Sequence, residues 1–356
     1  MKRALSSTLN FAIVLLSVVL VLFILELVLR VRKGELTQTD NLLFKSHNFQ
    51  PDRLSVGYPE QVDPNLGWVP KPQIRGVDRS SGSPVQTLEN GIRSNGGQPI
   101  NGSHRILAIG DSFTWGEQVS DNETWPAYLQ QNTHTPVVNA GVSGYGIDQA
   151  VLRGEALFYS IKPTHVILSF IGNDIIRCGW SKAWGMQKPF FTVSNNGLEL
   201  KNVPVPEHKV IPPKLDPLRD FLGRSYLANA LMIRVNPSYW LADLGYTFEL
   251  VEPRYEEVAC LLLKRLKKAG EKLKFDILVV AQYEESLSRD DLTLTKNLLT
   301  CAEKTGLKTL DLLPLMEEMR KKGEAEYTSF INWHHTAIGN KLVAEQIAKH
   351  FSDKNL

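Results

Sequence analysis

The sequence predicts an α/β protein, a three-layer α/β/α sandwich with a mostly parallel central sheet, preceded by one N-terminal transmembrane helix. From residue 104 onward, short apolar runs alternate with amphipathic segments of helical length, a pattern that indicates parallel strands covered by helices on both faces. The first 33 residues hold a long apolar run. The composition, 43% hydrophobic and 22% charged, is that of a folded globular chain.

Composition also excludes several classes of protein. The 356 residues include 40 Lys plus Arg and 38 Asp plus Glu, a formal net charge of +2, whereas nucleic-acid binders carry a marked basic excess. The three cysteines, Cys178, Cys260 and Cys301, cannot all pair within one chain and form no C-x-x-C motif, so neither a disulfide scaffold nor a zinc ribbon is indicated. One disulfide is left open, and the sequence does not decide it.

Residues 9–31 are predicted to form the transmembrane helix, behind a short stub at 1–8. Phe11–Leu29 is apolar apart from Ser17 and Glu26. At about 1.5 Å rise per residue this run is roughly 28 Å long, close to the thickness of the hydrocarbon core of a bilayer. It has no polar face, which argues against a buried core helix.

A cleaved signal peptide is the main alternative, because Lys2 and Arg3 form a basic start. The apolar run is longer than the roughly 7–15 residues usual in signal peptides, and no small-residue cleavage site follows it. An uncleaved anchor is therefore favoured. Arg30, Arg32 and Lys33 follow the run, so basic residues flank both ends and charge alone does not choose the orientation.

The chain after the anchor divides at residue 104. Residues 32–103 are rich in Gly, Pro, Asn and Ser without a helical period, and we expect a stalk and lead-in segment. Residues 104–356 are expected to form the catalytic-type domain. Its predicted strands are Arg105–Ile109, Pro136–Asn139, His165–Phe170, Ile277–Ala281 and Thr309–Leu312, and its predicted helices lie at about 123–131, 147–159, 255–273, 289–305 and 337–351.

An insertion at about 178–254 interrupts the alternation. Its many prolines break regular elements, and it holds three of the seven tryptophans of the chain. Two interpretations stay open: an irregular packing segment, or a cap over the carboxyl edge of the sheet, where open α/β sheets place their ligands.

Four blocks of polar and glycine residues follow the strands or precede the last helix. Each block alone is a weak signal, because turns are rich in these residues. The blocks are AIGDSFTWG at 108–116, NAGVSGYG at 139–146, GND at 172–174 and NWHHTAIGN at 332–340.

Together the four blocks resemble those of the SGNH/GDSL hydrolase superfamily, in the order of that family and each at the expected strand or helix. The similarity extends over about 105–351, roughly 70% of the chain. Residues 63–72 and 90–93 also resemble the lead-in of membrane-anchored bacterial members. The resemblance implies the flavodoxin-like three-layer fold of the family.

The resemblance also implies roles for particular residues. Ser112 would be the nucleophile, and His334 would take its proton and return it to the leaving alcohol. The backbone N–H groups of Ser112 and Gly144 and the side-chain amide of Asn173 would form the oxyanion hole. Glycine at position 144 lets the backbone approach the oxyanion closely.

Two histidines compete for the role of base. His334 is favoured over His335 because Thr336 and Gly339 then lie two and five residues after the base, as in the family. The alternative for the pair is a surface cluster at the start of the last helix.

The last block departs from the family, which usually has an aspartate two or three residues before the histidine. Here Asn332 stands two residues before His334. Asparagine in place of the aspartate of a serine-protease triad costs about 10⁴ in turnover. We interpret Asn332 as the residue that orients His334; the alternatives are an acid from elsewhere, such as Asp311 or Glu326, or a weakened enzyme.

These observations predict a serine esterase-type hydrolase of carboxylic esters, acting on an acylated small molecule, an envelope glycan or a lipid ester. The alternatives are an O-acyltransferase acting on a cell-envelope polysaccharide, and a weakly active or non-catalytic envelope scaffold. The chain has no GxxxxGK[ST] or HExxH motif, so no cofactor, no metal and no nucleic-acid partner is expected. We expect a single-pass protein of the cell membrane whose domain lies in the periplasm or elsewhere outside the cytoplasm; the oligomeric state is left open.

Overall fold

The computed structural model of the chain describes residues 2–33, 36, 60–78, 81–97, 100, 102–183, 186–195, 197–206, 217–236, 239–240 and 248–352. The chain divides into two compact units. The first, which we call the helical unit, comprises Met1–Val56 and Lys209–Thr247. The second, the sheet unit, comprises Gly57–His208 and Phe248–Leu356.

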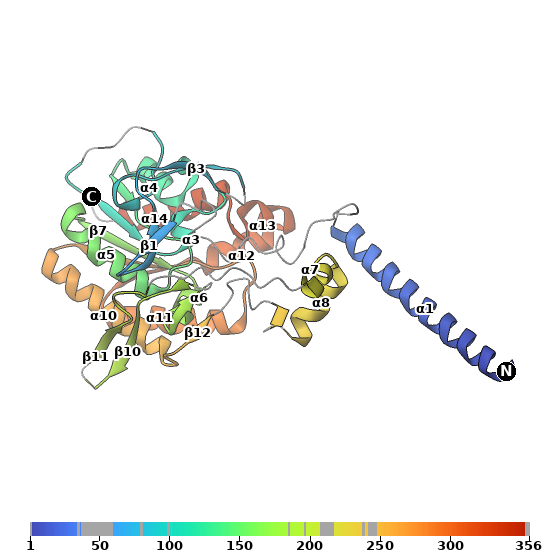
Figure 1. The fold of residues 1–356 in the computed structure, drawn as a ribbon. Coiled ribbons are helices and arrows are strands. Elements are labelled where there is room, and N and C mark those ends of the chain that lie inside the picture. The colour runs from blue at the N-terminus through green and yellow to red at the C-terminus, as the bar shows by residue number, and fades with distance from the viewer. Residues whose placement is uncertain are drawn as a thin grey trace. The chain divides into compact units, whose positions relative to one another are not determined.

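The sheet unit is built on five parallel strands in the order β14-β13-β7-β5-β6, of which β7 is labelled in Figure 1. Numbered along the chain, this order is 2-1-3-4-5, as in flavodoxin-like folds. The predicted parallel sheet is confirmed. The strands are β5 (Ile106–Ile109), β6 (Val137–Asn139), β7 (His165–Phe170), β13 (Asp276–Ala281) and β14 (Lys308–Asp311).

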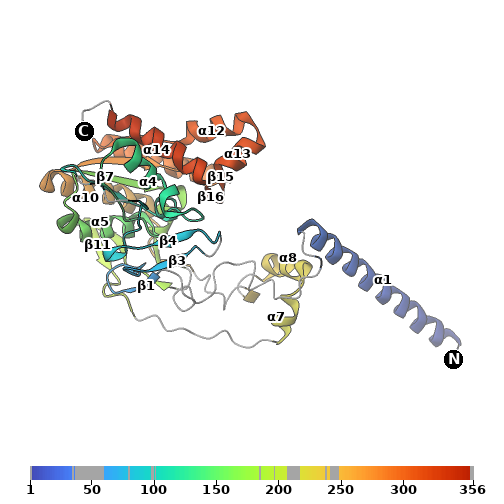
Figure 2. The same ribbon diagram turned by 90° about the horizontal axis from the view of Figure 1, so that it is seen from above.

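Helices cover both faces of the sheet, which confirms the three-layer prediction. On one face α4 packs against α14, and on the other α5 and α11 pack against α10 (Figure 2). In α10 the buried residues Val258, Leu262 and Leu266 recur every four positions, so one apolar stripe faces the core. The helices are α4 (Trp125–Thr133), α5 (Ile147–Ile161), α10 (Tyr255–Leu273), α11 (Arg289–Lys304) and α14 (Ala337–Ser352).

Short elements connect the strands and the long helices, and α3, α6, β15 and β16 contain parts of the polar blocks. The short elements are α3 (Ser112–Trp115), η2 (Asp121–Glu123), α6 (Gly172–Arg177), α12 (Leu313–Lys322), α13 (Glu324–Phe330), β15 (Ile331–Asn332) and β16 (His334–His335).

A disulfide joins α10 to α11. It links Cys260 and Cys301, which are 41 residues apart, and Cys178 is a buried free thiol. The pairing that the sequence left open is therefore Cys260 with Cys301.

The boundary predicted at residue 104 is wrong for the described part of the lead-in, because residues 60–97 belong to the sheet unit. Trp68 and Arg93 are fully buried there; the Trp68 indole donates to the Ser143 carbonyl at 3.0 Å. Short strands with Gly and Pro gave no periodic signal, and tertiary burial decided their place. They are β1 (Glu60–Asp63), β2 (Gly67–Pro70), β3 (Arg75–Val77), β4 (Pro84–Gln86) and the turn η1 (Glu89–Gly91).

The insertion predicted at 178–254 is shared between the two units. Its first part contains β8 (Trp180–Ala183), β9 (Met186–Gln187), β10 (Phe190–Ser194) and β11 (Gly197–Lys201), and β12 (Glu249–Leu250) closes the insertion. The β10–β11 hairpin packs against α10, on one face of the sheet (Figure 1). This packing supports the interpretation of the first part as a packing segment.

The helical unit contains α1 (Lys2–Lys33), α7 (Pro217–Leu222) and α8 (Tyr226–Val235). Within α1, Ala12–Arg32 is long and apolar enough to cross a membrane, as either an anchor or a signal sequence would be.

Candidate active site

The first two predicted site residues lie at the switch point of the sheet. Ser112 follows β5 and Asn173 follows β7, and these strands are hydrogen-bonded neighbours. Because the chain order reverses between them, the helices that follow leave toward opposite faces and open a crevice at the carboxyl ends of the strands. Ligands of doubly wound sheets bind in this crevice.

The chain turns sharply around Ser112, the first residue of α3. At Gly110, an added Cβ would lie 2.4 Å from the Ser169 carbonyl oxygen, so only glycine lets β5 approach β7 this closely. At the other end, Gly116 has a φ of 85°, in the left-handed region that favours glycine. These two glycines place Ser112 at the edge of the sheet.

Ser112 is joined to His334 by a hydrogen bond of 2.9 Å between its Oγ and the imidazole Nε2. The two residues are 222 positions apart in the chain. The His334 ring packs on Phe113, with ring centroids 4.9 Å apart, and its backbone N–H donates to Gln118 at 3.2 Å. The structure therefore brings together the nucleophile and the base that the sequence predicted.

His335 lies in a different environment. Its ring is buried between Phe113 and Phe330, with centroid distances of 5.2 and 4.8 Å. Burial lowers the pKa of His335 to about 3, so the ring is neutral at physiological pH. His335 is a packing residue, and His334 is the histidine that faces Ser112.

Asn332 and His334 are neighbours through their backbones and not through the Asn332 side chain. The two residues are backbone partners in the β15–β16 pair, and Asn332 is exposed. In the described part of the chain, no hydrogen bond links the Asn332 side chain to His334. Asp311, one alternative acid, instead accepts from the Tyr283 hydroxyl at 2.7 Å, and no described contact links Glu326 to His334. The orienting role of Asn332 stays a prediction.

Glu117 is a site carboxylate that sequence reasoning missed. Its Oε2 lies 3.5 Å from His334 Nε2, and its Oε1 accepts from the Ser143 hydroxyl. In a serine-protease triad the acid binds the other ring nitrogen. The only sequence signal was an acidic residue directly after the Gly116 turn.

Asn173, the predicted side-chain donor of the oxyanion hole, donates its amide to Glu284 Oε2 at 2.8 Å. Glu284 follows β13 and was also missed. A carboxylate oxygen resembles in charge the oxyanion of a tetrahedral intermediate, so the amide is already directed at an anionic oxygen.

Gly144, the other predicted oxyanion donor, has a φ of 75°. Side chains rarely adopt this left-handed conformation. The neighbouring Ser143 and Tyr145 are both hydrogen bonded to Trp68 of the lead-in. The lead-in thus holds the turn that directs the Gly144 backbone.

Buried charges lie beneath Ser112. Burial raises the pKa of Asp111 to about 6, while the nearby charges of Arg177 and His334 lower it. Burial and the neighbouring Asp111 hold the pKa of Asp174 well above its usual range. Arg177 Nη1 lies 2.6 Å from Asp174 and 4.0 Å from Asp111. Asp174 is thus paired with Arg177 beneath the site.

Comparison with known proteins agrees with this geometry. The model of the GDSL-like Lipase/Acylhydrolase family matches residues 108–230. The chain is 36% identical over 74 residues to Thioesterase 1/protease 1/lysophospholipase L1 of Escherichia coli K12, which covers 20% of this chain and 36% of that protein. The chain thus spans about a third of the length of the curated relative that it matches.

Solved structures of the same kind are similar at low identity. A putative lipolytic protein of the G-D-S-L family from Desulfitobacterium hafniense is 14% identical, with 69% of this chain and 99% of that chain covered and a TM-score of 0.40. The acetylxylan esterase Axe2 from Geobacillus stearothermophilus is 14% identical, with 71% and 95% covered and a TM-score of 0.40.

The family match and the strand order point to one class of protein. Residues 108–230 match the GDSL-like lipase/acylhydrolase family, and the sheet unit has the parallel central sheet of the SGNH α/β hydrolase fold.

Proposed function

We propose that this protein is a membrane-anchored serine esterase in which Ser112 is the nucleophile and His334 the general base. The observation that carries the proposal is the 2.9 Å hydrogen bond between Ser112 Oγ and His334 Nε2 at the switch point of the sheet. A serine is a weak nucleophile by itself, and a base within hydrogen-bond reach activates it.

In the first half of the reaction, Ser112 Oγ attacks the ester carbonyl carbon while its proton moves to His334 Nε2. The carbonyl π electrons move to the oxygen, which becomes an oxyanion held by the N–H groups of Ser112 and Gly144 and by the Asn173 amide. When the intermediate collapses, His334 gives its proton to the leaving alcohol, and an acyl group stays on Ser112. Water, deprotonated by His334, then releases the acid.

The negative charge of Glu117 stabilises the protonated form of His334 during the reaction. The imidazolium that forms on His334 needs a nearby negative charge, and Asn332 supplies none. Glu117, 3.5 Å from Nε2, supplies one from the side of Ser112. We therefore propose a Ser112–His334 dyad with Glu117 as the electrostatic partner in place of the usual aspartate.

Glu284 is the present hydrogen-bond partner of the Asn173 amide. Its carboxylate accepts the amide hydrogen bond that the oxyanion needs. The Asn173 amide has two N–H donors, so a substrate carbonyl either uses the second donor or displaces Glu284 before the tetrahedral intermediate forms.

Trp333 supports an acylated glycan or lipid as substrate. It lies next to His334 in the chain and its side chain is 75% exposed. The φ of Trp333 is 66°, and its N–H donates to Glu285 at 3.1 Å. An exposed indole held in this conformation offers a face on which a sugar ring or an acyl chain packs. The Escherichia coli relative is named in part as a lysophospholipase.

The disulfide between Cys260 and Cys301 supports a location outside the cytoplasm, because disulfides persist in oxidising compartments. Together with the candidate span Ala12–Arg32, it favours a domain on the extracytoplasmic side of the membrane. A reporter fused after Leu356 is expected to act outside the cytoplasm; activity only inside would contradict this orientation.

The chemistry is tested with the full chain in detergent. Hydrolysis of p-nitrophenyl acetate is compared with that of Ser112→Ala, and a fluorophosphonate is expected to modify Ser112. Equal turnover in both proteins, with matched circular dichroism, would contradict the proposal. Acyl transfer to an added glycan at the expense of hydrolysis would identify a transferase that uses the same acyl-enzyme.

A further inference from the structure

The helical unit contains a carboxylate in an unusual place. Glu26 lies six residues before Arg32, the end of the candidate span, which is about 9 Å along the helix. It accepts hydrogen bonds from the Ser225 hydroxyl at 2.8 Å and from the backbone N–H groups of Tyr226 and Leu227 at 3.1 and 2.9 Å. Glu26 of α1 therefore caps the N-terminus of α8.

Arg30 completes this junction. Its Nε lies 2.8 Å from Glu26, its Nη2 donates to the Arg224 carbonyl at 2.8 Å, and its guanidinium lies 5.7 Å from the centre of the Tyr226 ring. A carboxylate near hydrocarbon is costly unless it is paired and hydrogen bonded, and Glu26 is both. The junction fixes the start of α8 beside the C-terminal end of α1, as both views show (Figures 1 and 2).

Helix α8 is apolar, and none of its residues is buried in the described structure. Leu231 and Val235 are 57% and 69% exposed, and Phe221 of the preceding α7 is 71% exposed. A core helix would bury such residues. At ten residues, about 15 Å, α8 is also too short to cross a bilayer.

We propose that α7 and α8 lie in the interface of the bilayer that α1 spans, with their exposed apolar side chains in lipid. The occupant is lipid because Glu26 ties the start of α8 to the end of the span. Arg224 and Arg234, near the two ends of α8, suit anionic headgroups. This inference rests on the proposed role of α1 as an anchor and not on the chemistry at Ser112.

The connectivity gives the proposal a consequence. The chain leaves the sheet unit after residue 208, forms α7 and α8, and returns at residue 248. The insertion is thus a second membrane attachment, in addition to the segment that follows α1. Two attachments restrict how far the domain moves from the bilayer surface and how it rotates there.

The test uses the full chain, one copy in each nanodisc of phosphatidylethanolamine and phosphatidylglycerol. Spin labels on Leu231→Cys and Val235→Cys are expected to be more accessible to oxygen than to a water-soluble nickel chelate. A label on Tyr159→Cys, an exposed position of α5, is the control and should show the opposite order. Labels at 231 and 235 that match the control, or that exclude both reagents as in a protein contact, would overturn the proposal.

The junction is tested in the same discs. Glu26→Ala should make the label at 231 more accessible to the nickel chelate and less accessible to oxygen. Glu26→Gln, which still accepts hydrogen bonds, should change this accessibility less. Glu199→Ala, at an exposed carboxylate of the sheet unit, should not move it. An unchanged reading in Glu26→Ala would show that Glu26 does not hold α8 at the membrane. Neither measurement depends on ester hydrolysis, so a failure here is distinct from a failure of the proposed function.

Discussion

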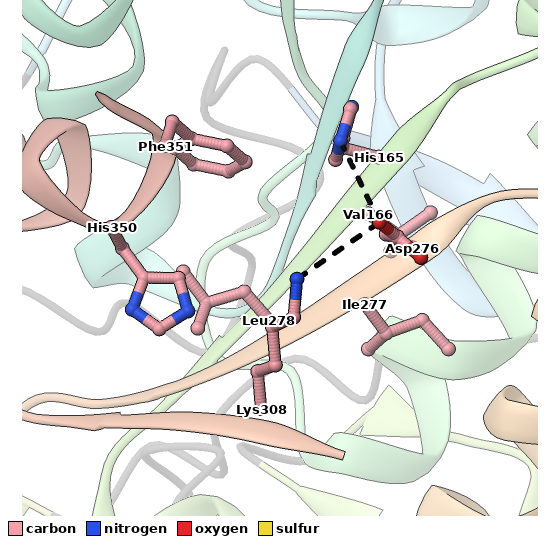
Figure 3. Close-up of a pocket in the computed structure, with 8 residues that line it drawn as sticks. All are labelled: His165, Val166, Asp276, Ile277, Leu278, Lys308, His350 and Phe351. Carbon is pink, nitrogen blue, oxygen red and sulfur yellow. Dashed lines mark ion pairs between the residues drawn. The ribbon is translucent and has the colours of Figure 1, made fainter. Parts of the chain in front are cut away.

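The two edges of the central sheet both place a histidine near a carboxylate. At the amino edge, the first residues of β7, β13 and β14 line a small pocket (Figure 3). There His165 Nε2 and Lys308 Nζ each lie 4.0 Å from Asp276. At the carboxyl edge, His334 lies 2.9 Å from Ser112 and 3.5 Å from Glu117.

The difference between the edges lies in the backbone around these side chains. At the carboxyl edge the helices α3 and α6 begin, so Ser112 and Asn173 lie in the first turns of the two helices. At the amino edge α5 and α10 end just before β7 and β13. Asp276 is 70% exposed, and solvent screens its ion pairs. The carboxyl edge, where His334 is hydrogen bonded to Ser112, is therefore the candidate site for ester hydrolysis.

The largest expected effect distinguishes His334 at the carboxyl edge from His165 at the amino edge. His334→Ala should lower kcat/KM for an activated ester by at least about 10³, because it removes the base. His165→Ala, at the amino edge, should leave kcat/KM unchanged. Steady-state kinetics of both variants checks this. Comparable losses of kcat/KM would contradict the difference between the two edges.

The next effect tests the oxyanion donor. Asn173→Ala should lower kcat by about 10²–10³, the usual cost of losing one donor of an oxyanion hole. Lys308→Ala, which also removes a hydrogen-bond donor but at the other edge, is the control. A change in KM alone would mean that Asn173 binds substrate and transition state equally.

A smaller effect is expected at the electrostatic partner of the base. Glu117→Gln should lower kcat about tenfold, because one charge near the imidazolium is lost, a change of about 1.4 kcal/mol. Asn332→Ala should change kcat less, since no described hydrogen bond joins it to His334. The reverse order would restore Asn332 as the orienting residue.

The last expected effect is on stability rather than on activity, and it tests the assignment of the neighbouring His335. Burial lowers the pKa of His335 to about 3, while an unfolded histidine binds a proton below about 6.5. The unfolded state therefore takes up the proton first, so stability is full above pH 6.5 and falls as the pH drops toward 3, by up to about 1.4 kcal/mol per pH unit.

The loss of stability with falling pH should be smaller in His335→Phe than in the unmodified protein. A difference in stability that is the same at every pH does not affect this comparison. Denaturant unfolding of both proteins between pH 7 and 4.5 measures the difference. Parallel pH curves would mean that His335 is not buried as a neutral ring.

The sequence by itself determined the parallel sheet and the positions of Ser112, Asn173 and His334. Strand and helix periods are local, and the glycines around Ser112 reflect a local turn, so both can be read without knowing what packs nearby. The apolar run from Phe11 to Leu29 is likewise a matter of length and composition.

Tertiary structure alone decided which distant groups meet. Nothing local marks Glu117 and Glu284 as neighbours of His334 and Asn173, because strands far apart in the chain bring them to one edge. Burial of Trp68 moved the lead-in into the sheet unit, against the expectation of a stalk. The disulfide and the cap of α8 by Glu26 also join segments whose pairing depends on packing and on hydrogen bonds that form only once the chain has folded.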